Sequence, residues 1–211
     1  MSRGSRPFRC QGRCPPSRDG PGGSCHAGST PRRVKALLAS CDRASVKGCR
    51  DFAILVLLTR LGIRAGEVAA LELGDIDWRG GQILVRGKAA RVERLPLPVD
   101  AGDALADYVR DARPRGERRE LFLRVAAPYR GITVGGISIV VHAACDRAGL
   151  PSIGTHRLRH TVASELLREG AGLAEIGQLL RHRSMTSTAI YAQVDTVPLR
   201  QLARPWPGGV A

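Results

Sequence analysis

The first 30 residues of this 211-residue chain contain no Leu, Ile or Val. A segment without large aliphatic side chains buries too little apolar surface to offset the entropy lost on ordering. We therefore expect a disordered, basic leader rich in Gly, Pro and Ser over residues 1–29, a folded domain over 30–203 and a flexible tail over 204–211. The length of the folded part suits one domain and is too short for two large ones.

Long apolar runs are also lacking. The longest aliphatic run, Ala53 to Leu58, is closed by Thr59 and Arg60, whereas a bilayer span needs about 20 apolar residues. No apolar segment of a signal peptide follows the N-terminal arginines. These absences predict a cytoplasmic protein that makes no membrane contact. We also expect the protein to be bacterial and associated with the nucleoid.

Paired cysteine motifs are missing too, although the chain has six cysteines. Three lie in the leader and three in helical-looking stretches: Cys10, Cys14, Cys25, Cys41, Cys49 and Cys145. The leader cysteines and His26 leave an improvised zinc site open, but no regular zinc-ligand spacing is present. Reduced thiols in a cytoplasmic protein are the favoured interpretation.

Positive charge is abundant. The formal net charge is +14; five Arg and one Asp give the first 30 residues +4, so +10 remains for the rest. Such a surface attracts polyanions, which makes nucleic acid the expected partner, with a solvated basic surface as the alternative on charge alone. Only three of the 33 basic residues are lysines: Lys35, Lys47 and Lys88. A lysine in this arginine-dominated chain is therefore a candidate functional residue.

Hydrophobic periodicity predicts a mainly α fold with one small antiparallel sheet, in a single domain. Helices are expected from Pro31 onward and over these further ranges: 46–61, 67–73, 101–112, 137–148, 155–169, 173–180 and 187–194. Two strands are expected over 82–86 and 91–97, joined by a turn that contains Lys88. Pro96 and Pro98 mark the second strand as an exposed edge.

Thr155 to His160 opens one of these helices with several cationic or titratable side chains. His156 and Arg159 are three residues apart and share one face near the helix N-terminus. The backbone N–H groups and the macrodipole at that end favour an anion such as phosphate. Taken alone, a helix start with solvated Arg and His explains the pattern equally well.

Four separated motifs change this balance, because together they resemble the tyrosine recombinase, or phage integrase, family. They are Arg64 within Leu61–Glu67, Lys88 in the hairpin turn 24 residues later, His156-x-x-Arg159, and His182 followed nine residues later by Tyr191. Each motif alone is weak, whereas their order and spacing are specific. The resemblance covers about residues 30–203 and implies the catalytic-domain fold of that family.

The activity that the resemblance implies also suits these side chains. Arg64 and Arg159 would neutralise the non-bridging oxygens of a DNA phosphodiester, so that neither metal nor ATP is needed. Tyr191 would be the nucleophile that forms a 3′-phosphotyrosine link, and His156 would accept its proton. Lys88 would protonate the departing 5′-oxygen.

The resemblance further implies that His182 hydrogen-bonds the phosphate or steadies Tyr191. Arg181 and Arg183, which flank it, are candidate contacts to the DNA backbone, with a solvated pair as the alternative. Glu67 is expected to be a structural partner of Arg64.

Three functional hypotheses follow. The favoured one is a site-specific recombinase or integrase of a mobile element that acts on double-stranded DNA as a homodimer or tetramer assembled there. The others are a truncated, catalytically impaired DNA-binding remnant and a DNA-relaxing topoisomerase with the same chemistry. Family members generally carry an extra DNA-clamping domain, and the leader occupies its place here.

Overall fold

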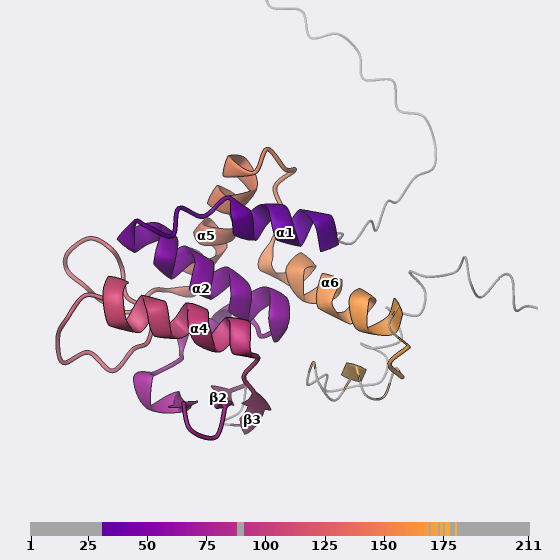
Figure 1. Cartoon of the computed structure of the whole chain (residues 1–211), viewed down its shortest axis with the longest axis horizontal. Coiled ribbons are helices and arrows are strands. Elements are labelled where there is room, and N and C mark those ends of the chain that lie inside the picture. Colours follow the sequence, from indigo (N-terminus) through magenta and orange to yellow (C-terminus); the bar gives the residue numbers. More distant parts are fainter. Residues whose placement is uncertain are drawn as a thin grey trace, which may run out of the picture.

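Helix α2 (Val46–Arg60) is the central element around which the other helices pack. The structure is a computed structural model and describes residues 31–87, 91–168, 170–172, 174, 176–177 and 180. Its other elements are α1 (Pro31–Ala39), α3 (Ala65–Ala69), the 3₁₀ turn η1 (Leu73–Asp75), β1 (Ile76–Asp77), β2 (Gln82–Arg86), β3 (Val92–Pro96), α4 (Val99–Asp107), the π-helical turn η3 (Tyr108–Ala112), α5 (Val134–Arg147) and α6 (Thr155–Arg168). The mainly α fold with a small antiparallel sheet is thus confirmed (Figure 1).

The sequence of α2 explains its central place. Its start is capped by Ser45, whose Oγ accepts a hydrogen bond from the Gly48 N–H at 3.0 Å. Every residue from Ala53 to Thr59 is buried, so the helix is covered on all sides, as expected for an apolar helix without a polar face. Helices α1, α4, α5 and α6 all contact it. The loop that follows its last residue, Arg60, therefore begins at a fixed position beside α6.

The sheet has the order β1-β2-β3 and is antiparallel throughout. Ile83 pairs with Leu95, and both side chains are buried. Pro96 pairs with Gln82 on the outer strand, which confirms the expected edge. Sequence periodicity did not predict β1, because two residues are too few to show an alternation.

Two predicted helix boundaries were wrong by three residues or more. The helix expected over 67–73 ends at Ala69, because the chain beyond it pairs with a distant loop instead. The Leu71 carbonyl accepts the Leu121 N–H at 2.8 Å, and the Leu73 N–H donates to the Arg119 carbonyl at 2.8 Å. The helix expected to begin at residue 137 begins at Val134, capped by Thr133.

The apolar core has two parts. The larger lies around α2, and Tyr108 and Phe122 stack within it with ring centroids 5.3 Å apart. The smaller joins α6 to the chain that follows, through Val162, Ala163, Ile176 and Leu180. The leader, the tail, most of the helix expected over 173–180 and the helix expected over 187–194 lie outside the described residues.

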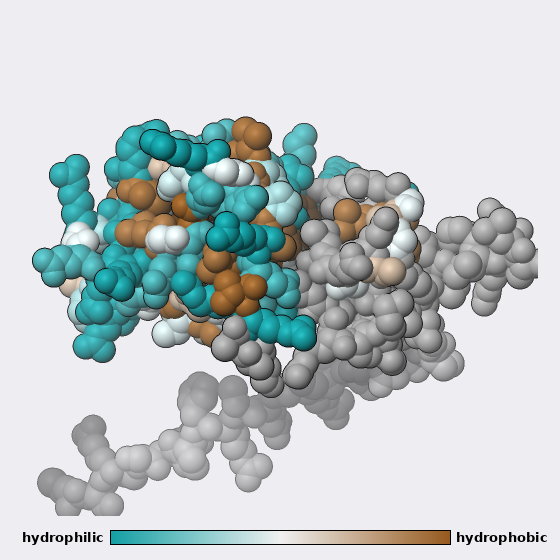
Figure 2. Space-filling view, turned by 90° about the horizontal axis from the view of Figure 1, so that it is seen from below, coloured by the Kyte–Doolittle hydropathy of each residue, from teal (hydrophilic) through white to brown (hydrophobic). Residues whose placement is uncertain are grey.

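One face of the described part of the chain is mainly hydrophilic (Figure 2). On the face shown in Figure 2, hydrophobic atoms form small separate groups among hydrophilic ones. Among the described residues, Cys41, Cys49 and Cys145 are buried and form no disulfide. In the described part of the chain, the helices are all too short or too polar to cross a bilayer.

Candidate active site

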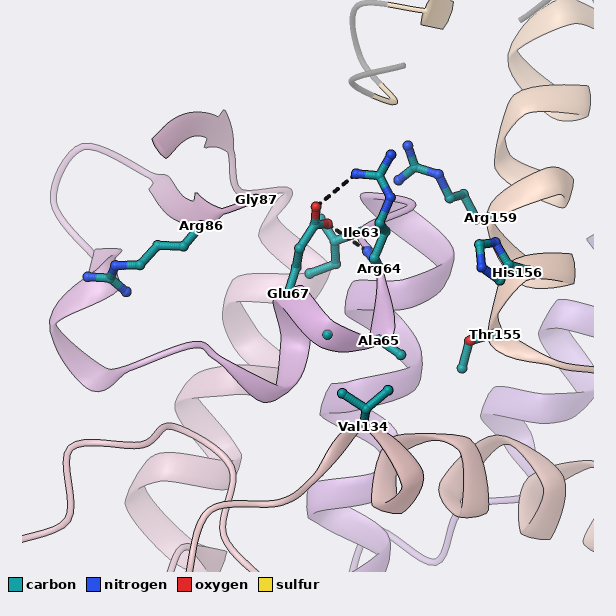
Figure 3. Close-up of a pocket in the computed structure, with 11 residues that line it drawn as sticks. Ile63, Arg64, Ala65, Glu67, Arg86, Gly87, Val134, Thr155, His156 and Arg159 are labelled. Carbon is teal, nitrogen blue, oxygen red and sulfur yellow. Dashed lines mark hydrogen bonds and ion pairs between the residues drawn. The ribbon is translucent and has the colours of Figure 1, made fainter. Parts of the chain in front are cut away.

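A cavity of about 490 Å³ lies where the N-terminus of α3, the end of β2 and the N-terminus of α6 meet. It is lined by Ile63, Arg64, Ala65, Gly66, Glu67, Arg86, Gly87, Val134, Thr155, His156 and Arg159. Three residues singled out by the sequence, Arg64, His156 and Arg159, thus share one cavity although they lie up to 95 positions apart. Figure 3 shows the two guanidinium groups directed toward the same space.

Arg64 occupies the N-cap position of α3, with an extended backbone. Glu67, one turn later, holds it at two points. Its Oε2 accepts the Arg64 backbone N–H at 2.7 Å, and its Oε1 accepts a hydrogen bond from Arg64 Nη1 at 3.0 Å. The same carboxylate therefore caps the helix and orients the guanidinium, which confirms Glu67 as the structural partner of Arg64 (Figure 3).

Glu67 also lies beside the base of the hairpin. Its side chain is only 5% exposed, and a Cβ placed on Gly87 would lie 3.8 Å from Glu67 Oε1. The Gly87 N–H donates to the Arg91 carbonyl at 2.7 Å, which closes the hairpin at this point. Gly87, the last described residue of this strand end, thus lies beside the Arg64–Glu67 pair.

Arg159 lies in the first turns of α6 and is 5% exposed. Burial of a guanidinium is costly unless its N–H groups are satisfied. Arg159 Nη1 donates to the main-chain carbonyl of Gly62 in the loop that follows α2. Since Arg64 is two residues further along that loop, one short segment orients both arginines.

His156 is exposed at the mouth of the cavity, one turn before Arg159 on α6. The ring lies on the cavity side of the helix in Figure 3. Together with Thr155 it brings the amino end of a 14-residue helix to the cavity, where the macrodipole adds positive potential.

Arg86 lines the cavity by position, but its guanidinium points away from the two other arginines (Figure 3). It forms an ion pair with Asp75, whose side chain is 2% exposed. Asp75 Oδ2 also accepts the Glu72 N–H at 2.8 Å. This pair fixes the end of β2, and hence the hairpin, to the turn η1, a role for Asp75 that the sequence did not predict.

Five of the predicted site residues lie outside the described residues: Lys88, Arg181, His182, Arg183 and Tyr191. Of the other two tyrosines, Tyr108 is 1% exposed, and its hydroxyl accepts the Leu123 N–H at 3.1 Å. Burial raises the pKa of the Tyr108 phenol, which makes it a poor nucleophile. Tyr129 is half-exposed but does not line the cavity.

The geometry suits an anion with two or more oxygen atoms. Two guanidinium groups offer planar pairs of donors, and His156 adds a group that can accept or donate a proton. Within the described residues, no group of three His, Cys, Asp or Glu side chains is placed to hold a metal ion. The two guanidinium groups and His156 favour binding of a phosphate or a similar group.

Comparison with known proteins agrees with this geometry. The model of the phage integrase family matches residues 29–197. This chain belongs to the phage integrase family. It is 53% identical over 178 residues to "Putative integrase/recombinase y4rA" of Sinorhizobium fredii, a match that covers 83% of this chain and 43% of that protein. It is 36% identical over 167 residues to the tyrosine recombinase XerC of Oceanobacillus iheyensis, covering 76% and 54%.

Solved structures give the same result for the fold. The crystal structure of XerA recombinase matches with a TM-score of 0.70 and 26% identity, covering 84% of this chain and 65% of that one. XerH recombinase, solved in a post-cleavage complex with its difH substrate, matches with a TM-score of 0.69 at 21% identity, covering 82% and 51%. The chain spans about 40% of the length of y4rA and y4rF, although it spans 93% of a third relative, y4gC. This chain therefore has the catalytic-domain fold of tyrosine recombinases.

Some residues of the site had no signal in the sequence. Gly62 follows the C-cap of α2, and its carbonyl contact to Arg159 joins residues 97 positions apart. Val134 completes the cavity wall through the packing of α3 against α5. A main-chain acceptor or a wall residue leaves no local pattern, so only the folded structure identifies it.

Proposed function

We propose that this chain is the catalytic domain of a site-specific DNA recombinase or integrase that cuts and rejoins DNA through a 3′-phosphotyrosine intermediate. The observation that carries the proposal is the shared cavity of Arg64, His156 and Arg159. The family relationship and the net charge of +14 support DNA as the substrate. XerH, with a similar fold, has been solved bound to its DNA substrate.

The step is an in-line displacement at phosphorus. The phenol oxygen of Tyr191 attacks, the bond from phosphorus to the 5′-oxygen breaks, and a phosphotyrosine diester replaces the DNA diester. A phenol with a pKa near 10 is only about 0.1% ionised at neutral pH, so it needs a base. His156 takes that proton, while Lys88 gives a proton to the departing 5′-oxygen, which leaves as a hydroxyl group.

Arg64 and Arg159 bind the non-bridging oxygens, on which negative charge grows as the nucleophile adds. Loss of either guanidinium is expected to slow cleavage by about 100- to 1,000-fold. The bond energy is kept in the phosphotyrosine link, so rejoining uses the freed 5′-hydroxyl of either strand and requires neither ATP nor a metal ion. His182 hydrogen-bonds the phosphate or steadies Tyr191, and Arg181 and Arg183 contact the DNA backbone.

Strand exchange requires several active sites on one DNA assembly, so we propose a homodimer or tetramer formed on double-stranded DNA. Integrase and recombinase names among the relatives support a role in a mobile genetic element. A transposon integrase of similar fold, solved with transposon-end DNA, supports the same assignment.

A trapping experiment tests the activity and identifies the target sequence in one step. The protein is incubated with a pool of nicked duplexes whose sequence around the nick is randomised, so that a cut releases a short fragment and cannot be reversed. Covalent protein–DNA adducts are isolated under denaturing conditions and sequenced. The wild-type chain is expected to form adducts in the presence of EDTA and without ATP, enriched for one sequence.

Tyr191→Phe is the matched control, because it removes one oxygen and should abolish the adduct while leaving DNA binding intact. Adducts formed equally by wild type and Tyr191→Phe would refute Tyr191 as the nucleophile. DNA binding without any adduct would instead support the impaired-remnant hypothesis. Relaxation of supercoiled DNA without strand exchange would support the topoisomerase hypothesis.

A further inference from the structure

Two glycines in the described part of the chain occupy the same position relative to a helix. Gly62 follows α2 after its C-cap Leu61, and Gly149 follows α5 after its C-cap Ala148. Both have left-handed backbones, with φ of +56° and +62°. A left-handed glycine in this position is a common way to end a helix. Helix termination alone therefore explains why each is glycine.

Their surroundings differ. A Cβ added to Gly149 would have nothing within 4 Å, whereas one added to Gly62 would lie 2.8 Å from Leu180 Cδ2 and 3.6 Å from Val162 Cβ. The Gly62 carbonyl also accepts the hydrogen bond from Arg159 Nη1. Gly62 thus packs closely against α6 and the smaller apolar cluster, and its carbonyl oxygen points at the buried guanidinium of Arg159.

The direction of that carbonyl depends on the left-handed conformation. An L-residue with a side chain is strained at positive φ, because its Cβ approaches the carbonyl oxygen. Relief of the strain rotates the peptide units on either side of residue 62. Rotation would turn the acceptor away from Arg159.

We propose that Gly62 is a positioning residue for cleavage: its left-handed backbone aims a main-chain carbonyl at Arg159 and so fixes the second guanidinium against the phosphate that Arg64 contacts. This inference rests on the proposed function, in which Arg159 neutralises the phosphate in the displacement step. Gly62 itself contacts no reacting atom. Its effect on the rate is transmitted through Arg159.

The experiment compares two substrates that differ in charge at the scissile phosphorus. One is the nicked duplex selected in the trapping experiment, and the other carries a methylphosphonate at the same position. A methyl group there replaces one non-bridging oxygen and removes the negative charge that Arg159 is proposed to neutralise. A variant that acts through Arg159 should therefore lose rate on the phosphate substrate and retain it on the methylphosphonate.

Gly62→Ala is expected to cleave the phosphate substrate about 10- to 100-fold more slowly than wild type, because a small misplacement of a catalytic group carries a cost of that order. On the methylphosphonate its rate should lie within about three-fold of wild type, as should that of Arg159→Ala. Gly149→Ala is the matched control. It introduces the same kind of backbone strain without the close contact to Leu180, and it should lower the melting temperature less than Gly62→Ala without changing either cleavage rate.

Gly62→Asn carries the same comparison if Gly62→Ala does not fold, because asparagine tolerates the left-handed region better than alanine. It is expected to lose less rate on the phosphate substrate than Gly62→Ala. A Gly62 variant that is slow on both substrates, or as fast as wild type on both, overturns the inference. If Arg159→Ala is equally slow on both substrates, the proposed role of Arg159 fails as well.

Discussion

Replacement of Glu67 by glutamine should slow DNA cleavage without weakening DNA binding. The carboxylate uses one oxygen for the Arg64 backbone N–H at 2.7 Å and the other for Arg64 Nη1 at 3.0 Å. A glutamine amide has a single acceptor oxygen, and its NH₂ group would face the second donor. One of the two hydrogen bonds is therefore lost, and two N–H groups are brought together.

The size of the effect can be bounded from these contacts. A hydrogen bond between charged groups contributes about 1.5–3 kcal/mol. Complete loss of one phosphate-binding donor costs about 3–4 kcal/mol in the barrier, which sets the upper limit. We expect Glu67→Gln to slow cleavage by about 10- to 100-fold, since about 1.36 kcal/mol corresponds to ten-fold. Binding of DNA should be unchanged or tighter, because the substitution removes a negative charge from the cavity.

Single-turnover adduct formation at saturating protein measures the rate, and a separate titration of the selected duplex measures binding. Asp111→Asn is the matched control: Asp111 also accepts hydrogen bonds from an arginine, Arg110, but its side chain is 59% exposed. That variant should cleave like wild type. A wild-type cleavage rate for Glu67→Gln, or a defect that disappears once weaker binding is accounted for, would refute the orienting role of Glu67.

Two further predictions concern stability. Arg50→Met should lower the free energy of unfolding by about 3–5 kcal/mol, because it leaves the carboxylate of Asp51, which is 1% exposed, without its ion-pair partner; denaturant titration measures this, and a change below about 1 kcal/mol would contradict it. The free energy of unfolding should also fall above about pH 8.5, where the thiols of the unfolded chain begin to ionise. Burial raises the pKa of Cys41, Cys49 and Tyr108. These groups therefore keep their protons in the folded state and release them on unfolding. Equal stability at about pH 8 and about pH 10.5 under reducing conditions would exclude this pH dependence.

Local sequence patterns predicted those parts of the fold that local interactions determine. The nearly continuous apolar sequence of α2 and the alternating residues of β2 and β3 were identified with boundaries within one or two residues. The segment after α3 was wrongly assigned to helix because its conformation depends on Leu121, about 50 residues away. Such pairing depends on which distant loop reaches the segment, and the sequence near α3 does not contain that information.

In the candidate site, too, local sequence patterns predicted some features, whereas others depend on contacts between distant segments. Arg64, His156 and Arg159 were identified from motif order, which the resemblance supplied, and the structure shows that they share a cavity. Their common location could not be deduced from spacing, because it requires α2 to end beside α6. The Gly62 carbonyl was missed because an acceptor on the main chain is compatible with any residue type.

Under the proposed mechanism, the charges around the cavity would let a site with two arginines favour the transition state over bound substrate. Among the lining side chains that face the cavity, Arg64 and Arg159 contribute +2 and Glu67 contributes −1, a net charge that matches the single negative charge of a DNA phosphodiester. When the Tyr191 phenol attacks under the proposed mechanism, its proton passes to His156, and the phosphorus centre gains a second negative charge. His156 becomes positive in the same step, so the cavity gains positive charge when the phosphate gains negative charge. The Gly62 carbonyl that orients Arg159 is neutral, so this contact does not cancel the positive charge of the guanidinium. That charge can then interact with the negative charge that develops on the phosphate in the transition state.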